Sequence, residues 1–238
     1  MHNPTPFAHQ LLALALLTFA AGCETPAITD QARTGPFFVP INHVADPSLG
    51  GMRRIVLLPL SGGLIAPPES AAALDPVFAT ELQKQNRFEV VALTRQEFRR
   101  QFGVEEISST TALPRDFLTV LRREYAVDGV LFIDITAYQA YQPLILGVRA
   151  KLATIGDVRL VWSFDNVFAA DNPAVVNSAR HHFLNSERSS GVPADLTPIV
   201  QQSPTRFATY AAAATFATLP PVRAVQTDQR GKSNSAGR

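Results

Sequence analysis

The sequence predicts an α/β (α+β) domain, built as a mixed β-sheet of about five strands with helices packed on it and flanked by disordered tails. Two observations support this fold class. Continuous apolar runs, which are typical of strands buried on both faces, alternate along the chain with segments that have the apolar period of amphipathic helices. In addition, 46% of the residues are hydrophobic and 17% are charged, as expected for a globular protein.

The first predicted strand, Arg53–Leu60, is a continuous apolar run that ends at Pro59 and the turn Ser61–Gly63. A helix is predicted over Ala71–Gln85, because its apolar residues share one face, and Arg87–Leu93 predicts a second strand. The buried face of this helix is expected to contain Leu74, Val77, Phe78 and Leu82, and its face in water Asp75, Glu81 and Lys84.

Two further helices are predicted after the second strand. Thr94 is suited to cap the first of them, with Glu97 at the capping-box position, so that Phe98 and Phe102 face the core. The second helix is predicted over Leu113–Ala126, where the apolar residues again lie on one face.

The sheet is completed by three strands. Val130–Ala137 predicts another buried strand, and Leu144–Ile155 and Leu160–Phe168 predict a β-hairpin with one buried and one wet face around a turn at Gly156. An Ala-rich helix over Pro204–Leu219 is expected to pack on the sheet or on a neighbouring subunit. The aromatic residues expected in the core of the hairpin are Trp162, Phe164 and Phe168.

One charged residue falls inside a predicted buried strand. Asp134 needs a partner there, because an unpaired buried carboxylate is costly, and Arg149 on the next strand is the predicted partner. We expect this pair to be structural rather than to act as an acid or a base.

The only cysteine, Cys23, directly follows an uncharged apolar run, Leu11–Ala21, and the small residue Gly22. The run has the length of a signal-peptide core and is too short to span a bilayer, which takes about 20 apolar residues. The arrangement resembles the lipobox of bacterial lipoprotein precursors. This resemblance implies cleavage after Gly22, diacylglycerol on the Cys23 sulfur and acylation of the new amino group. The alternative is a buried cysteine at the end of a core helix.

Composition divides the chain into four parts. They are a lipoprotein signal peptide (residues 1–22), the lipidated cysteine with a flexible linker (23–50), a globular domain (51–220) and a disordered basic tail (221–238). Within the linker, Phe37, Phe38 and Val39 are hydrophobic enough to dock on the domain instead. A single cysteine excludes an intramolecular disulfide, so the core alone must stabilise the domain.

Four segments resemble a known superfamily, which contains the curli-secretion lipoprotein CsgG, the penicillin-binding-protein activator LpoB and the amino-terminal domain of TolB. The resemblance covers roughly Arg53–Phe168, whereas Ala169–Thr197 matches nothing that we can assign. It implies a TolB-N/CsgG-like fold and a function in the bacterial cell envelope. The resembling segments are Ile55–Leu60, Phe88–Arg95, Asp128–Thr136 and Val148–Trp162.

The sequence predicts no catalytic, cofactor-binding or metal-binding residues and no cofactor. It lacks the glycine-rich motifs of nucleotide-binding proteins and the nucleophile motifs of hydrolases. A net charge of +1 gives no overall positive electrostatic potential that would attract nucleic acid. His181 and His182 are adjacent and therefore point in different directions. A carboxylate and imidazole cluster of these histidines with Asp165, Asp171 and Glu187 is the alternative to a solvated loop.

We therefore expect a non-enzymatic lipoprotein on the periplasmic face of the outer membrane that serves a cell-envelope assembly as a binding or scaffold module. Glu24 favours the outer membrane, because aspartate at this position is the signal for retention in the inner membrane. The expected partners are the membrane, through the lipid anchor, and an envelope protein or a second copy, with Tyr138 and Tyr141 as candidate contacts. The alternatives are a subunit of a CsgG-like oligomeric secretion channel and, third, an enzyme acting on envelope polymer.

Overall fold

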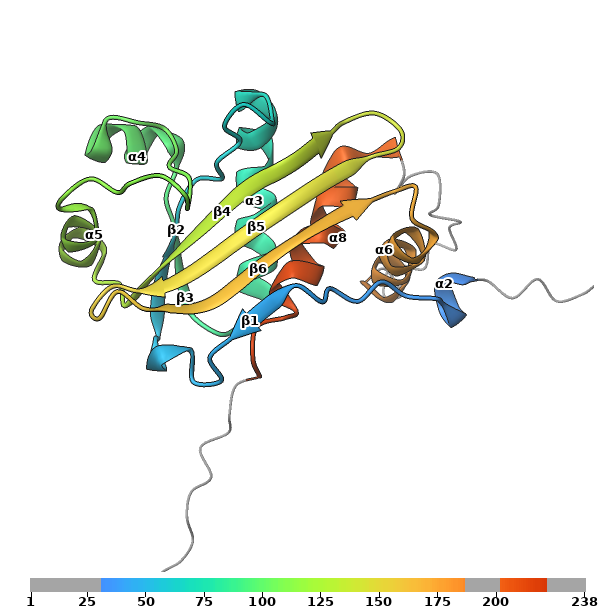
Figure 1. Cartoon of the computed structure of the whole chain (residues 1–238), viewed down its shortest axis with the longest axis horizontal. Helices are drawn as coiled ribbons and strands as arrows, with labels where there is room; N and C mark the ends of the chain where they lie inside the picture. Colours follow the sequence, from blue (N-terminus) through green and yellow to red (C-terminus); the bar gives the residue numbers. More distant parts are fainter. Residues whose placement is uncertain (1–30, 187–201, 222–238) are drawn as a thin grey trace, which may run out of the picture.

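The computed structural model describes residues 31–186 and 202–221. These residues form an α+β domain with one mixed sheet, as predicted (Figure 1). Cys23, the predicted signal peptide, Glu187 and the predicted basic tail lie outside the described residues.

Six strands form the sheet, in the order β1-β6-β5-β4-β2-β3. β2 pairs in parallel with β3 and β4, and the other neighbours are antiparallel. The expected number of about five is too low by one, because β1 comes from the predicted linker. The strands are β1 (His43–Ala45), β2 (Arg54–Leu57), β3 (Glu89–Ala92), β4 (Gly129–Gln139), β5 (Ile145–Thr154) and β6 (Leu160–Ala169).

Helices cover the two faces of the sheet unequally (Figure 1). One face packs against α3, α6 and α8, and the opposite face packs against α4 and α5 mainly over β2, β3 and β4. On the β5 and β6 part of that second face, Arg149, Lys151 and Val167 are half-buried or exposed. The helices are α2 (Gln31–Thr34), α3 (Pro68–Lys84), α4 (Arg95–Phe102), α5 (Phe117–Tyr125), α6 (Pro173–Ser186) and α8 (Pro204–Phe216), with a 3-10 turn η1 (Leu49–Gly51).

The aromatic residues of the hairpin lie where the alternation predicts. Trp162, Phe164 and Phe168 are buried, and their rings are 6.2 and 6.3 Å apart along β6. Phe216 of α8 contacts Trp162, and Tyr210 of α8 contacts Phe168 edge to face. The last helix therefore packs on this sheet, which is one of the two locations predicted for it.

Residues 36–46 differ from the expected linker, because they pack on the domain. The Phe38 ring lies 5.5 Å from Phe168, and the Phe38 amide donates hydrogen bonds to the Ala174 carbonyl and to Ser178 Oγ. β1 then adds to the edge of the sheet beside β6. Burial of Phe38 and Ala45 against the core offsets the entropy lost by ordering this stretch.

Three expectations for the helices are wrong. Glu81 is only 3% exposed, although the helical period places it in water, and it receives a hydrogen bond of 2.6 Å from Lys84. Asp75 is also withdrawn from water, because Arg95 of α4 contacts it. The helix predicted over Leu113–Ala126 begins later, at Phe117, where Asp116 occupies the N-cap position.

The capping box of α4 is present as predicted. Thr94 Oγ1 accepts the Glu97 amide at 3.2 Å, and the Glu97 carboxylate accepts the Thr94 amide at 2.9 Å. This cap fixes the start of a helix of eight residues whose Phe98 is fully buried.

Replacing Thr94 with alanine is expected to lower the free energy of unfolding by about 1 kcal/mol, because the Glu97 amide loses the hydroxyl oxygen that caps it. Urea unfolding followed by the fluorescence of the buried Trp162 measures this change. Thr80→Ala is the matched control, since Thr80 is exposed within α3 and alanine has the higher helix propensity. An equal loss in both variants would contradict a role specific to the cap.

Candidate functional site

The topology changes direction at the carboxyl end of β2. From β2 the chain runs through α3 to β3 on one side, and from β3 it returns through α4 and α5 to β4 on the other side. In open α/β sheets, ligands bind beyond the carboxyl ends of strands at such a switch point. This end of β2 is therefore the first place to look for a functional site.

A carboxylate of the chain itself occupies the loop that follows β2. Glu106 Oε1 accepts hydrogen bonds from the Gly62 amide at 3.0 Å, the Gly63 amide at 3.1 Å and Ser61 Oγ at 3.2 Å. Successive backbone amides of this kind form a nest that suits anions. The predicted turn at Ser61–Gly63 is thus an anion-binding loop that an internal anion already fills.

Arg95 joins this loop to two other segments. Its Nη1 lies 2.7 Å from Glu106 Oε2, its Nε lies 2.8 Å from Asp75 Oδ2, and its Nη2 donates to the Leu60 carbonyl at 2.7 Å. The Arg95 side chain is only 14% exposed. One buried guanidinium therefore connects α3, the end of β2 and the segment between α4 and α5.

The two carboxylates beside Arg95 have opposite pKa shifts. Burial raises the pKa of Asp75, and its hydrogen bonds from Leu60 and Arg95 offset only part of that effect. Burial also acts to raise the pKa of Glu106, but the hydrogen bonds from Arg95 and Gly63 outweigh it, so that this pKa is lowered. Glu106 is therefore a weak proton acceptor, which does not suit it to activate Ser61 as a nucleophile.

The predicted Asp134–Arg149 ion pair is wrong. The two residues are opposite each other on β4 and β5, but the Arg149 guanidinium pairs with Asp165 of β6 at 2.7 Å. The Asp134 carboxylate instead accepts hydrogen bonds from the amide and the hydroxyl of Ser109. Asp165 on β6 is opposite Arg149 on β5 and pairs with it. The segment after α4 brings Ser109 over β4, where it binds the buried Asp134.

A hollow of about 350 Å³ lies between these groups. Its lining includes Gly62, Asp134, Thr136 and Arg149, and within the described residues Thr136 Oγ1 is buried without a hydrogen-bond partner. The two charged residues that line the hollow each have another partner, since Asp134 binds Ser109 and Arg149 binds Asp165. Their arrangement holds segments of the fold in place and brings together no nucleophile and base.

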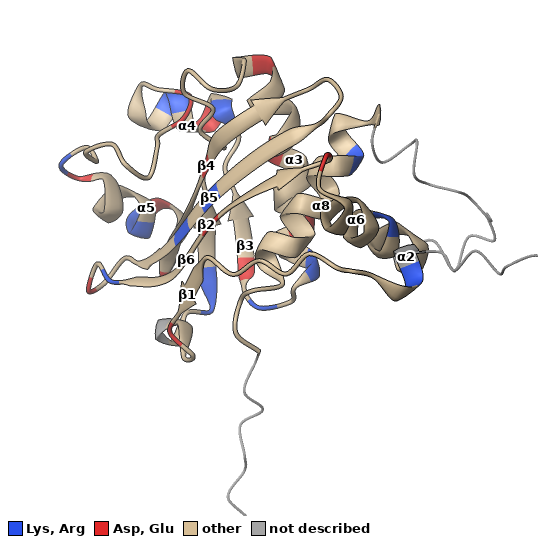
Figure 2. Cartoon of the chain, turned by 45° about the vertical axis from the view of Figure 1, so that its right-hand side comes forward, with Lys and Arg blue, Asp and Glu red and all other residues tan. Residues whose placement is uncertain are grey.

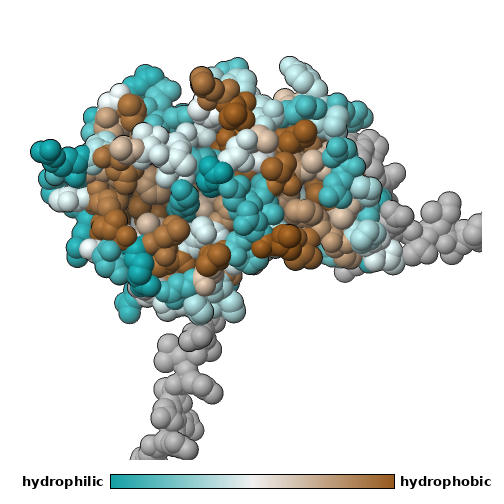
Figure 3. Space-filling view, viewed as in Figure 1, coloured by the Kyte–Doolittle hydropathy of each residue, from teal (hydrophilic) through white to brown (hydrophobic). Residues whose placement is uncertain are grey.

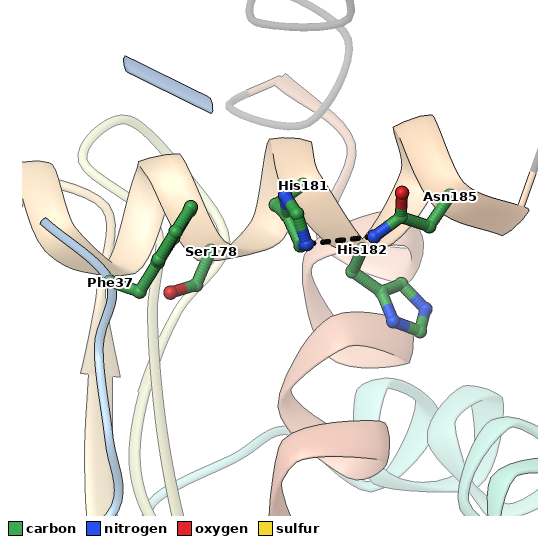
Figure 4. Close-up of a pocket in the computed structure, with 5 residues that line it drawn as sticks. All are labelled: Phe37, Ser178, His181, His182 and Asn185. Atoms are coloured by element: carbon green, nitrogen blue, oxygen red, sulfur yellow. Dashed lines mark hydrogen bonds between the residues drawn. The ribbon is translucent and has the colours of Figure 1, made fainter. Parts of the chain in front are cut away.

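The two histidines lie on α6 and point to different sides, as their adjacency predicts (Figure 4). The His181 ring contacts the Phe37 ring in a tilted arrangement, with centroids 4.8 Å apart, and its Nε2 lies 2.7 Å from the side-chain amide of Asn185. His182 turns inward to Tyr210, and burial lowers the pKa of its imidazole. A shallow hollow of about 420 Å³ is lined by Phe37, Ser178, His181, His182 and Asn185.

The alternative cluster of imidazoles and carboxylates does not form in the described part of the chain. Asp165 is on the sheet, paired with Arg149, and no group of three metal-ligating side chains occurs among residues 31–186 and 202–221. Glu187 lies outside the described residues.

The predicted contact tyrosines lie at one end of the sheet. Tyr138 is on β4 and packs partly against the core, whereas Tyr141, in the turn before β5, is 81% exposed. The proposed lipidation site, Cys23, lies outside the described residues. In the part of the chain that the structure describes, no helix combines the length and the apolarity needed to cross a bilayer.

Sequence reasoning missed the group around Arg95. The helical period assigned Asp75 to the wet face, and no local motif joins Asp75, Arg95 and Glu106. The two glycines after a buried strand were the one signal that a backbone anion site could form there.

No protein family matches the chain, and no curated protein matches it. Among solved structures, the chain is similar to the lipoprotein GNA1162 from Neisseria meningitidis, with 18% identity over 58% of this chain and 96% of the other and a TM-score of 0.41. It is also similar to the PelC dodecamer from Paraburkholderia phytofirmans, with 13% identity, 60% and 91% coverage and a TM-score of 0.39.

TolB from Acinetobacter baumannii is a third similar structure, with 11% identity and a TM-score of 0.30. The match covers 67% of this chain and 31% of TolB. A TolB structure and a lipoprotein are thus among the solved structures to which this α+β domain is similar. Such distant likenesses do not assign a function.

Replacing Glu106 with glutamine is expected to lower the free energy of unfolding by about 1–2 kcal/mol, because charge-assisted hydrogen bonds are lost. The pKa of Glu106 is lowered from 4.5 in the folded protein. Its contribution is therefore fully present above about pH 4.5 and is lost as the pH falls through the folded pKa. The variant should accordingly differ most from the parent near neutral pH and least in acid. Urea unfolding at several pH values measures this, with the neighbour Glu105→Gln as the control.

Proposed function

We propose that this protein is a non-enzymatic lipoprotein, anchored to the outer membrane through Cys23, that acts as a binding or scaffold module of a cell-envelope assembly. The observation that carries this proposal is the uncovered half of one sheet face. The charged groups near the switch point are bound to one another, whereas this face presents a broad surface to solvent.

The uncovered face is formed by β5 and β6, and α4 and α5 do not extend over it. The Arg149 and Asp165 ion pair lies across the face with both side chains more than a third exposed, and Val167 is 50% exposed. A surface that mixes an exposed ion pair with aliphatic side chains on rigid strands is suited to contact another protein. Tyr141 stands in the turn at one end of it.

The second candidate, a subunit of an oligomeric secretion channel, differs in two measurable properties. It requires a stable oligomer in detergent and permeabilisation of liposomes, whereas the scaffold module requires neither. If the protein is a channel subunit, the purified lipoprotein should insert into dye-loaded liposomes and release the dye.

Replacing Cys23 with serine is expected to move the protein from the membrane to the soluble fraction or to leave the uncleaved precursor, because a serine hydroxyl cannot receive the thioether-linked lipid. Fractionation together with metabolic labelling by a fatty acid measures this. The unmodified protein should carry the label and resist extraction by salt. A serine variant that sediments with lipid at unchanged size would contradict the anchor.

A photo-crosslinking residue in place of Lys151 or Ser163, on the uncovered face, is expected to capture a specific envelope protein in intact cells. The same residue in place of Thr80, which is exposed on α3, is the control. Equal crosslinking at all three positions, or none at any, would count against this face as the contact surface.

A further inference from the structure

The segment that leads from α2 into β1 has a fixed path along the edge of the sheet. Inward contacts of Phe38 hold it, and the side-chain amide of Asn177 donates to the Pro36 carbonyl at 3.3 Å. Because Phe38 points into the core, its neighbours in sequence are directed outward. The segment Gly35–Ala45 is called the edge segment below.

The edge segment presents several large apolar side chains to solvent. Phe37 is 40% exposed, Val39 70%, Ile41 85% and Val44 73%. These are four of the twelve large hydrophobic residues that are exposed in the described part of the chain. Figure 3 shows hydrophobic surface over the stretch between α2 and β1. An apolar cluster of this kind marks an interaction site.

The edge segment contains no Lys, Arg, Asp or Glu, and Figure 2 shows no charged residue on its ribbon. A protein interface has a polar rim that includes charged residues, and the uncovered sheet face, with Arg149, Lys151 and Asp165, fits that description. An uncharged aliphatic and aromatic strip instead suits the boundary between the headgroups and the acyl chains of a bilayer.

The edge segment is also close in sequence to the proposed anchor. The described part begins at Gln31, eight residues after Cys23. Eight residues of fully extended chain reach at most about 28 Å. A lipid on Cys23 would hold the edge segment near the membrane at a high effective concentration. Under that condition even a weak partition of a few side chains becomes a stable contact.

We propose that Phe37, Val39 and Ile41 insert into the headgroup and acyl-chain boundary of a phospholipid bilayer. They form a second, non-covalent membrane contact that fixes the orientation of the domain on its tether. The inference rests on the proposed lipid anchor, but the contact itself needs no lipid on Cys23 and can be measured without one.

The test uses the chain from residue 23 onward, which contains every described element, with Cys23→Ser. This background has no other cysteine, so single cysteines at Val39, Ile41 or Leu64 can carry an environment-sensitive fluorophore. Leu64 is the control, because it is fully exposed in the loop before α3. The probe is a vesicle of phosphatidylethanolamine and phosphatidylglycerol.

Labels at Val39→Cys and Ile41→Cys are expected to shift their emission to the blue on addition of vesicles and to be quenched by brominated acyl chains, whereas Leu64→Cys is not. In the unlabelled chain, Val39→Ser with Ile41→Ser should lower vesicle binding by about tenfold or more. No shift at positions 39 and 41, or an equal shift at Leu64, overturns the proposal. A shift that depends on protein concentration without vesicles also overturns it and identifies a second copy as the occupant. Because every labelled chain lacks Cys23, these results are independent of the fractionation that tests the anchor.

Discussion

One guanidinium, only 14% exposed, links the two helical layers of the fold. Arg95 binds Asp75 of α3, the carbonyl of Leu60 and the carboxylate of Glu106, and so it connects helices on opposite faces of the sheet at the end of β2. A buried ion pair of this kind costs desolvation, and removing one partner leaves an uncompensated charge. The same place in other α/β folds is open to ligands. Here the carboxylate of Glu106 occupies the backbone amides of the loop that follows β2.

The sequence predicts those parts of the structure that follow from local patterns. The strand at Ile55, the capping box of Thr94 and Glu97, and the alternation that buries Trp162 and Phe164 depend only on residues a few positions apart. The burial of Asp75 and the partner of Asp134 depend on segments that come together only in the folded chain. A local sequence pattern therefore cannot predict either of them. The edge strand β1 is too short to show a period of its own, and its pairing with β6 decides its structure.

The candidate sites also include features that local sequence predicts and features that only the folded chain brings together. Two glycines after a strand indicated a turn at Gly62, but the carboxylate that fills it comes from a distant segment. The sequence directed attention to His181 and His182, and their adjacency predicts that the two rings point in different directions, as they do on α6 (Figure 4). The exposed aliphatic residues Val39 and Ile41 become visible as a surface only once Phe38 is seen to be buried. Cys23 and the two tyrosines remain predictions from sequence.

The register of the sheet also constrains when the domain can form. β1 pairs with β6 through Val44 and Ser163, and β2 pairs with β4 through Ile55 and Gly129. A chain that emerges from its amino-terminal end, from a ribosome or through a narrow pore, therefore exposes β1 and β2 long before their partner strands arrive. Contacts so distant in sequence slow folding and leave apolar strands unprotected in the meantime. The pairing of β1 with β6 is complete only after residue 164 has passed the exit.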